Sequence, residues 1–270
     1  GEGGALSVIC TGGHLCKGSL SLTATSFADC SGFGDGGAVY VRGSPHVSIS
    51  DSSFEDCSAI GRGGAVFVEH GFYGQSTASV SNSSFHRCST LPFSSSIYRP
   101  RYGGGLALVT NGRAAVLGSS FTQCYAEEDG GGLMITDYAT TSGSRDQIVA
   151  GAQVLSSAIA PDIVLGSSRF YNCSTGISGG CFAAYTPRNL TIVDTDFIFG
   201  SAGLIAGGLH VRRLSGFFEL VRSSFQNNTA ANRVGAFYYE PNNWDFYSLG
   251  GGKRAVVRDT SFTGNVGLVD

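Results

Sequence analysis

The carboxylates are the side chains of this sequence that could do chemistry, and the best pair is Asp194 and Asp196, which flank a threonine just ahead of Phe197. Two or three carboxylates facing one cleft could hydrolyse a glycosidic bond. Clustered carboxylates with a cation and an Arg or Lys base would serve a lyase. The chain is repetitive, and neither neighbouring repeat carries carboxylates at both positions, while Asp51 and Asp259 match Asp194 only in distant repeats. A solvated turn is the favoured interpretation.

Other catalytic signals are isolated. The run Glu127, Glu128 and Asp129 precedes a glycine-rich segment and is typical of a solvated loop. GFGDGG at 32–37 resembles calcium-binding glycine repeats but lacks their nine-residue period, and there is no HExxH or GxSxG motif. The histidines share no repeat position: His14, His46, His70, His86 and His210. The sequence therefore predicts no catalytic, cofactor or metal site.

The eight cysteines favour an oxidising compartment, since an even number of scattered thiols is commoner outside the cytosol. No CxxC pair is present, which argues against zinc. Five share one repeat position, which indicates a ladder of small buried side chains: Cys30, Cys57, Cys88, Cys124 and Cys173. In-register parallel neighbours point their Cβ atoms the same way, so the first four are predicted to be reduced. The predicted disulfides join Cys10 to Cys16 and Cys173 to Cys181.

Four Asn-x-Ser/Thr sequons could accept glycans in a eukaryotic secretory pathway: Asn82, Asn189, Asn227 and Asn172. A chain so rich in Ser and Thr also contains such sequons by chance. Asn172 adjoins Cys173, near a stacked position with little room for a glycan.

Aromatic side chains are concentrated in the segment YYEPNNWDFYSLGGGK, in which the predicted contact loop contains Tyr238, Tyr239, Trp244, Phe246 and Tyr247. Exposed aromatics on a loop suggest a surface for sugars or proteins. The alternative is that they fold back and cover the core.

The element that positions these residues is a repeat, whose clearest copy is VSISDSSFEDCSAIGRGGAVFV at 47–68. Its phenylalanine recurs eight times: Phe27, Phe54, Phe85, Phe121, Phe170, Phe197, Phe225 and Phe262. An aliphatic residue lies five residues before each Phe and a Ser or Thr lies two before. A small residue after the glycine part, followed by an aliphatic or Phe residue, recurs just as regularly. Such self-similarity is the signature of a solenoid.

Two short runs with a period of two residues in each unit predict strands with one face inward. Like residues at like positions imply parallel strands stacked in register about 4.8 Å apart. The predicted fold is an all-β, single-stranded, right-handed parallel β-helix of about eight coils, forming one domain over residues 1–270. Extra residues at 69–78, 89–102, 136–162 and 238–254 are expected to project as loops, mainly from one edge. A short helix over Ile148–Ile159 is also expected.

Composition excludes several classes of function. The formal net charge is −3, and basic residues are scattered singly, so nucleic acid is not an expected partner. No apolar run approaches the ~20 residues that span a bilayer. The sequence starts within a glycine part and ends after a Phe part, so we expect a segment of a longer array whose coil ends contact further array or other copies.

The repeat resembles that of chlamydial polymorphic membrane proteins, which alternate Phe-x-x-Asn with Gly-Gly-Ala-(Ile/Leu/Val). GGAL at 3, GGAV at 36 and 63, FQNN and FTGN match that pattern, whereas FADC, FEDC, FHRC, FTQC and FYNC carry Cys for Asn. The resemblance covers the whole chain and implies a surface-displayed, often adhesive β-helix. Similar repeats occur in large surface proteins of algae and other protists.

The sequence therefore predicts a non-catalytic extracellular or cell-surface protein, either an adhesin or a structural unit of an appendage or filament. Its loop edge is expected to contact surface proteins or glycans, and no cofactor is expected. The alternative is a polysaccharide lyase or hydrolase of the pectin-lyase-like class.

Overall fold

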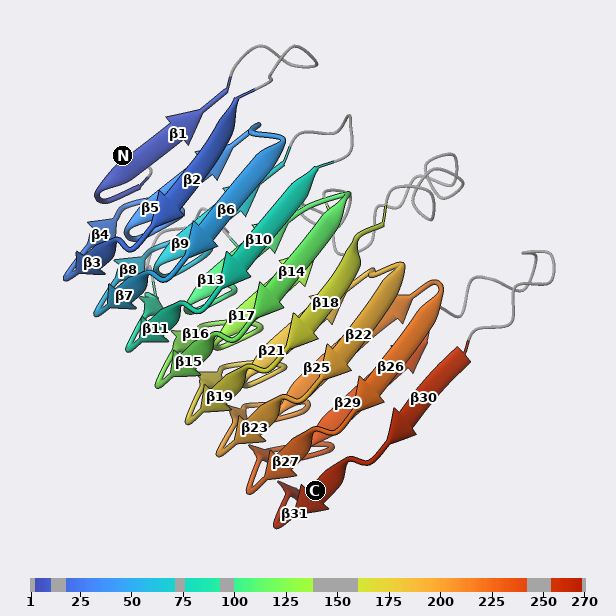
Figure 1. Ribbon diagram of the computed structural model, residues 1–270. Coiled ribbons are helices and arrows are strands. Elements are labelled where there is room, and N and C mark those ends of the chain that lie inside the picture. Colours follow the sequence, from blue (N-terminus) through green and yellow to red (C-terminus); the bar gives the residue numbers. More distant parts are fainter. Residues whose placement is uncertain are drawn as a thin grey trace, which may run out of the picture.

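The backbone winds as a right-handed parallel β-helix through four sheets in each of about eight coils (Figure 1). The computed structural model describes residues 3–10, 18–70, 76–92, 100–137, 160–241 and 254–268. Those residues form 32 strands and contain no helix, so none could cross a membrane as a helix. The predicted fold class is confirmed, and the assignment of residues 1–270 to one domain stays a prediction.

Each coil supplies one strand to each sheet, in the chain order A, B, C, D. Sheet A follows the glycine part and consists of β1 (Leu6–Ile9), β5 (Val39–Arg42), β9 (Val66–Glu69), β13 (Leu106–Val109), β17 (Leu133–Thr136), β21 (Phe182–Tyr185), β25 (Leu209–Leu214) and β29 (Phe237–Pro241). Sheet B holds the alternating run and consists of β2 (Ser19–Thr23), β6 (His46–Ser50), β10 (Thr77–Ser81), β14 (Arg113–Leu117), β18 (Asp162–Gly166), β22 (Asn189–Val193), β26 (Phe217–Val221) and β30 (Arg254–Arg258).

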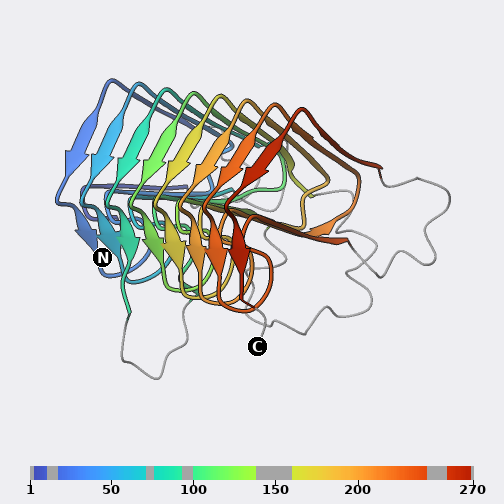
Figure 2. The same cartoon turned by 90° about the horizontal axis from the view of Figure 1, so that it is seen from below.

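The repeated phenylalanine lies at the centre of each strand of sheet C, which consists of β3 (Ser26–Ala28), β7 (Ser53–Glu55), β11 (Ser84–His86), β15 (Ser120–Thr122), β19 (Arg169–Tyr171), β23 (Asp196–Ile198), β27 (Ser224–Gln226) and β31 (Ser261–Thr263). Sheet D follows the cysteine position and consists of β4 (Ser31–Gly32), β8 (Ser58–Ala59), β12 (Ser89–Thr90), β16 (Tyr125–Ala126), β20 (Ser174–Thr175), β24 (Ser201–Ala202), β28 (Thr229–Ala230) and β32 (Val266–Gly267). Figure 2 shows the coils following one another in sequence order.

Equivalent residues pair in register from coil to coil. The longest insertion does not shift the register, because Val116 of β14 pairs with Leu165 of β18 across it. One irregularity occurs, between Arg212 and Leu214 in the pairing of β25 with β29.

The eight phenylalanines form one inward stack, as predicted. Successive ring centroids lie 4.6 to 5.1 Å apart, and the ring planes are tilted by no more than 13°. The inner six rings are buried, whereas Phe262, with a neighbouring coil on one side only, is 47% exposed. The stack therefore forms a continuous core along the solenoid axis.

Two left-handed corners flank each phenylalanine. The first lies three residues before it, at Ala24, Asp51, Asn82, Gly118, Ser167, Asp194, Arg222 and Asp259. The second lies two residues after it, at Asp29, Asp56, Arg87, Gln123, Asn172, Phe199, Asn227 and Gly264. Asp, Asn and Gly tolerate this conformation best, which explains their frequency in both columns.

The glycine pair forms the corner between sheets D and A. Gly63 has a φ of 65°, and a Cβ on Gly64 would overlap the carbonyl oxygen of Gly104 in the next coil. Neighbouring coils thus touch through their backbones at this corner. In the seventh coil Ala206 replaces the first glycine, with a φ of 56°.

Sheet A is buried on both faces through most of its length. Tyr40, Phe67 and Met134 point away from the stack, yet they are buried in a second hydrophobic cluster that includes Tyr102 and Tyr185. Four of the internal segments outside the described residues follow a strand of sheet A, and the fifth precedes the glycine corner ahead of β13. The expected helix over 148–159 falls outside the described residues and stays a prediction.

Candidate functional site

The cysteine position holds a ladder of hydrogen bonds between coils. The Sγ atom of Cys88 donates to the carbonyl oxygen of Phe54 in the preceding coil at 3.4 Å. The Nδ2 atom of Asn228 donates to the carbonyl oxygen of Phe197 in the same way at 2.9 Å. Cys and Asn can therefore replace each other at this position, because both side chains are short hydrogen-bond donors that reach the same carbonyl oxygen.

The predicted thiol state of this ladder is confirmed, since Cys30, Cys57, Cys88 and Cys124 are all free. Burial raises the pKa of Cys124 well above its usual range, which keeps its thiol protonated and able to donate. The column is a structural ladder between coils.

The predicted disulfide between Cys173 and Cys181 is wrong, because both thiols are free. Cys173 stays in the ladder and donates to the carbonyl oxygen of Phe121 at 3.4 Å. Cys181 instead fills space above Gly200, where an added Cβ would clash with its Sγ atom. Cys10 is disulfide-bonded, and its predicted partner Cys16 lies outside the described residues.

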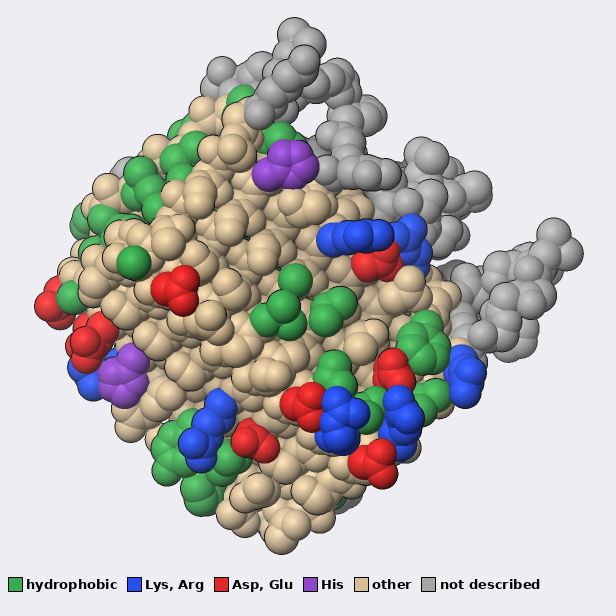
Figure 3. Space-filling model, viewed as in Figure 1, with side chains coloured by type: hydrophobic (Ala, Val, Ile, Leu, Met, Phe, Trp, Pro, Cys, Tyr) green, Lys and Arg blue, Asp and Glu red, His purple; other side chains and the backbone are tan. Residues whose placement is uncertain are grey.

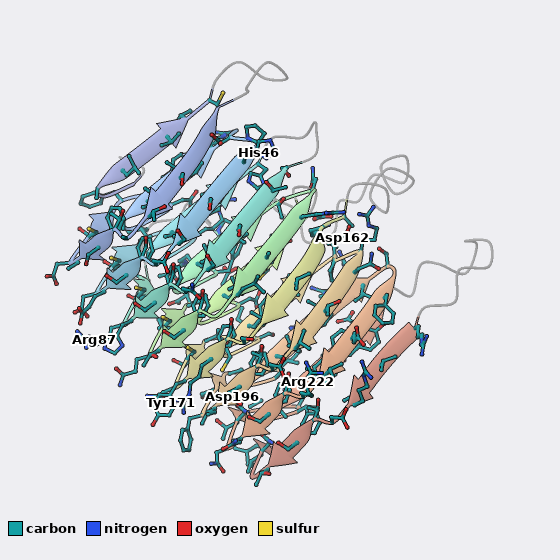
Figure 4. The ribbon with its side chains drawn as sticks, viewed as in Figure 1. His46, Arg87, Asp162, Tyr171, Asp196 and Arg222 are labelled. Carbon is teal, nitrogen blue, oxygen red and sulfur yellow. The ribbon has the colours of Figure 1, made fainter. Side chains whose placement is uncertain are left out.

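Asp194 and Asp196 do not share a strand. Asp194 lies at a left-handed corner and forms a bidentate ion pair with Arg222, at 2.8 Å to both carboxylate oxygens. The Arg222 hydrogen bond lowers the pKa of Asp194, which is opposite to the shift that a general acid needs. Asp196 begins β23 and accepts a hydrogen bond from Ser224. Both carboxylates are exposed and each has a different partner, but only Asp194 lies in a turn, because Asp196 is part of β23. Figure 4 shows Asp196 and Arg222 on the surface of the coils.

The acidic run at 127–129 is not the solvated loop that the sequence suggested. Glu128 and Asp129 are each only 8% exposed. Asp129 lies beside Tyr185, whose pKa is raised by burial and by this carboxylate. Glu127 remains partly exposed, with its carboxylate 4.0 Å from Arg101. The corner ahead of Gly130 is packed against the outer side of sheet A, which removes two of the three carboxylates from solvent.

A buried ion-pair cluster was missed by the sequence analysis. Arg62 donates to both carboxylate oxygens of Asp35, at 3.3 and 2.8 Å, and lies 3.6 Å from Glu69. Its guanidinium also lies over the ring of Phe67, 4.2 Å from the centroid. A signal was present, because Asp35 and Arg62 both immediately precede a glycine pair and so occupy one column in adjacent coils.

Two buried histidines lie at the same sheet. His70 Nδ1 is 2.8 Å from the Thr110 hydroxyl, and His210 Nδ1 is 3.3 Å from the Tyr185 hydroxyl. Burial is the main cause that lowers the pKa of each to about 4, so both are neutral near pH 7. Among the residues that the structure describes, no three His, Cys, Asp or Glu side chains are grouped to hold a metal ion.

The remaining described histidines have other hydrogen-bond partners. His46 is exposed (Figure 4) and contacts Thr77 at 2.9 Å. His86 contacts Arg87. His14 is outside the described residues.

Three of the four sequon asparagines lie at exposed left-handed corners: Asn82, Asn172 and Asn227. Asn189 differs, since its amide donates to Asp162 at 2.9 Å and its carbonyl accepts from the Phe217 N–H at 2.9 Å. The corner geometry gives an independent reason for asparagine at the first three positions. Glycosylation of all four stays a prediction.

Tyr238 and Tyr239 belong to β29 and not to a contact loop. Tyr239 is half-buried against Phe218, and the Tyr238 hydroxyl accepts a hydrogen bond from Arg233 at 2.7 Å. For these two, the alternative that the aromatics cover the coil is the better description. Trp244, Phe246 and Tyr247 lie outside the described residues.

Comparisons with protein-family models, with curated protein sequences and with solved structures found no match.

Proposed function

We propose that this chain is a non-catalytic structural unit of an extracellular or cell-surface rod, whose coils continue end to end into further coils or a second copy. The observation that carries the proposal is that each of the four sheets takes one strand from every coil and so runs from the first coil to the last. A resemblance of the repeat to bacterial surface β-helices supports the same proposal. The disulfide at Cys10 supports an oxidising location.

The C-terminal coil presents an apolar end. Val257, Phe262 and Val266 are 47 to 48% exposed, whereas Leu220 and Phe225, the equivalents of the first two in the preceding coil, are fully buried. Strands β29 to β32 each pair with a neighbour on one side only. Such edges are templates for another chain.

The N-terminal coil presents the complementary end. Phe27 is only partly buried, and its ring would continue the stack beyond Phe262 of a preceding copy. The thiols of the next four coils each donate to the Phe carbonyl of the coil before them. Cys30 occupies the same position in the first coil, so the Phe262 carbonyl of a preceding copy would be its equivalent acceptor. The two ends therefore repeat the interface that joins every internal pair of coils.

A structural role also agrees with how the surface carboxylates are used. Asp56 pairs with Arg87 and Asp194 pairs with Arg222, in each case across neighbouring coils. These ion pairs connect adjacent coils, and in each the arginine guanidinium neutralises the carboxylate.

Sedimentation velocity over a range of concentrations tests the proposal. The chain should form linear oligomers whose size grows with concentration, and Phe262→Lys should shift the distribution toward monomer. Thr263→Lys is the matched control, because it adds the same charge to the outward side of the same strand. A chain that is monomeric at every concentration, or that responds equally to both variants, would contradict the proposal.

A further inference from the structure

An exposed aromatic pair lies at the edge between sheets C and D. Tyr171 ends β19, and Phe199 occupies the left-handed corner after β23 in the next coil. Their ring centroids are 5.7 Å apart and the rings are perpendicular. Tyr171 is 38% exposed and Phe199 is 45% exposed.

Phe199 is costly at this position. Its φ is 54°, a conformation that disfavours bulky side chains. The same corner holds Asp29, Asp56, Asn172, Asn227 and Gly264 in five other coils, and Arg87 and Gln123 in the remaining two. Backbone preference would select Asp, Asn or Gly here, and core packing does not explain a phenylalanine that is nearly half exposed. Strained residues that the fold does not require are candidates for function.

Polar groups surround the two rings. The Arg169 guanidinium lies 5.9 Å from the Tyr171 ring centroid, and Arg169 pairs in register with Asp196 on the adjacent strand. Tyr171 pairs with Ile198, two residues from Asp196, so Tyr171 and Asp196 lie on the same face of adjacent strands (Figure 4). In Figure 3 small groups of hydrophobic side chains lie among charges of both signs on the lower part of this face. The patch thus combines apolar ring surface with hydrogen-bond donors and acceptors on a rigid scaffold.

We propose that Tyr171 and Phe199 form a subsite for a pyranose ring of a glycan. A pyranose has an apolar C–H face that can stack on an aromatic ring, and a rim of hydroxyls that Arg169 and Asp196 can bind. A stable protein interface buries about 800 Å² of surface on each partner, which is more than two aromatic rings surrounded by charged side chains can supply. Opposite charges at Arg169 and Asp196 give no net preference between a neutral sugar and a uronic acid. This inference does not depend on end-to-end stacking.

The test uses the whole chain on an array of immobilised neutral glucans, mannans, xylans and galactans, with polyuronates as the acidic arm. The chain should bind at least one pyranose glycan. Phe199→Gly and Tyr171→Thr should each weaken that binding by roughly tenfold, the scale of one lost aromatic contact. Both replacements already occur at the equivalent positions of other coils: Gly264 corresponds to residue 199, and Thr122 corresponds to residue 171. Phe33→Ser, which removes an aromatic that is 81% exposed elsewhere, is the control and should bind as the wild type does.

Thermal unfolding separates a binding role from a structural one. If Phe199 serves binding, Phe199→Gly relieves the left-handed strain and its Tm equals or exceeds that of the wild type. A lowered Tm for Phe199→Gly would show that the ring is structural and would overturn the proposal. Binding of no glycan by the wild type, or undiminished binding by both variants, would overturn it as well.

Discussion

Replacing Phe121 with alanine tests whether the phenylalanine stack is the main source of stability. Phe121 is fully buried between two rings, with centroids 4.7 and 4.8 Å away. Buried Phe to Ala changes cost about 3 to 5 kcal/mol, depending on how far the site can collapse. Here the ring rests against Gly105 and Gly132, which have no side chains to move into the space. We therefore expect a loss in the upper half of that range, about 4 to 5 kcal/mol.

The position along the stack should decide the size of the effect. Phe262 has one stacking partner and is 47% exposed, so Phe262→Ala should cost only about 1 to 2 kcal/mol. Thr122 follows Phe121 in β15 and points outward, so Thr122→Ala should change stability by less than about 0.5 kcal/mol.

Urea titration followed by circular dichroism and by tyrosine fluorescence would measure these differences. Coincident transitions from the two probes are needed before a free energy is assigned, since solenoids can unfold in parts. Equal losses for Phe121→Ala and Phe262→Ala would refute the reasoning, because the cost would then not follow burial. A loss below about 2 kcal/mol for Phe121→Ala would refute it too.

Three further perturbations have defined outcomes. The folded-state pKa of His70 and of His210 is about 4, below the ordinary 6.5, so the unfolded chain binds more protons than the folded chain between these pH values. Stability should therefore fall as the pH drops from 6.5 to 4, by up to about 3 kcal/mol per histidine. Urea midpoints at pH 7 and pH 5 would show this loss, and an unchanged midpoint would contradict it. Asp35→Asn should cost roughly 3 kcal/mol, because it removes the carboxylate that binds Arg62 through two oxygens and leaves this largely buried charge with only the more distant Glu69. The double variant with Arg62→Met should recover part of that loss in the same titration. Ala206→Gly should raise stability by about 1 kcal/mol, since it removes a Cβ from a left-handed corner; a lower Tm would show that the Ala206 methyl group packs usefully.

The sequence predicted what the repeat enforces in every coil. Register is set by backbone pairing, so a residue class that recurs at one position must lie in one column, and the phenylalanine stack followed from that alone. The reduced state of Cys57 and Cys88 followed from the direction of their side chains. Columns also contained the Asp35 and Arg62 pair, which becomes visible only when unlike residues before successive glycine pairs are compared.

Features that depend on packing outside the coil could not be predicted in this way. Glu128 and Asp129 follow the pattern of a charged loop, yet the outer side of sheet A buries them. Tyr238 and Tyr239 fall within the extra residues 238–254 that the repeat predicts to form a loop, whereas β29 extends to include them. Phe199 gave no signal, because it lies in a column whose residues vary and whose shared property is a backbone angle.

The failed disulfide shows why exceptions in such a fold have to be analysed across columns. Gly200 breaks the cysteine column, and Cys181 breaks the column of small residues after the glycine pair. Taken singly, each is an anomaly, and Cys181 beside Cys173 suggests a bridge. In the structure the Cys181 thiol occupies space that a side chain at Gly200 would need, so the two exceptions are one exchange of volume between two columns of the same coil. A close-packed interior requires this kind of exchange, because a larger side chain in one column needs a smaller one in the column that it meets.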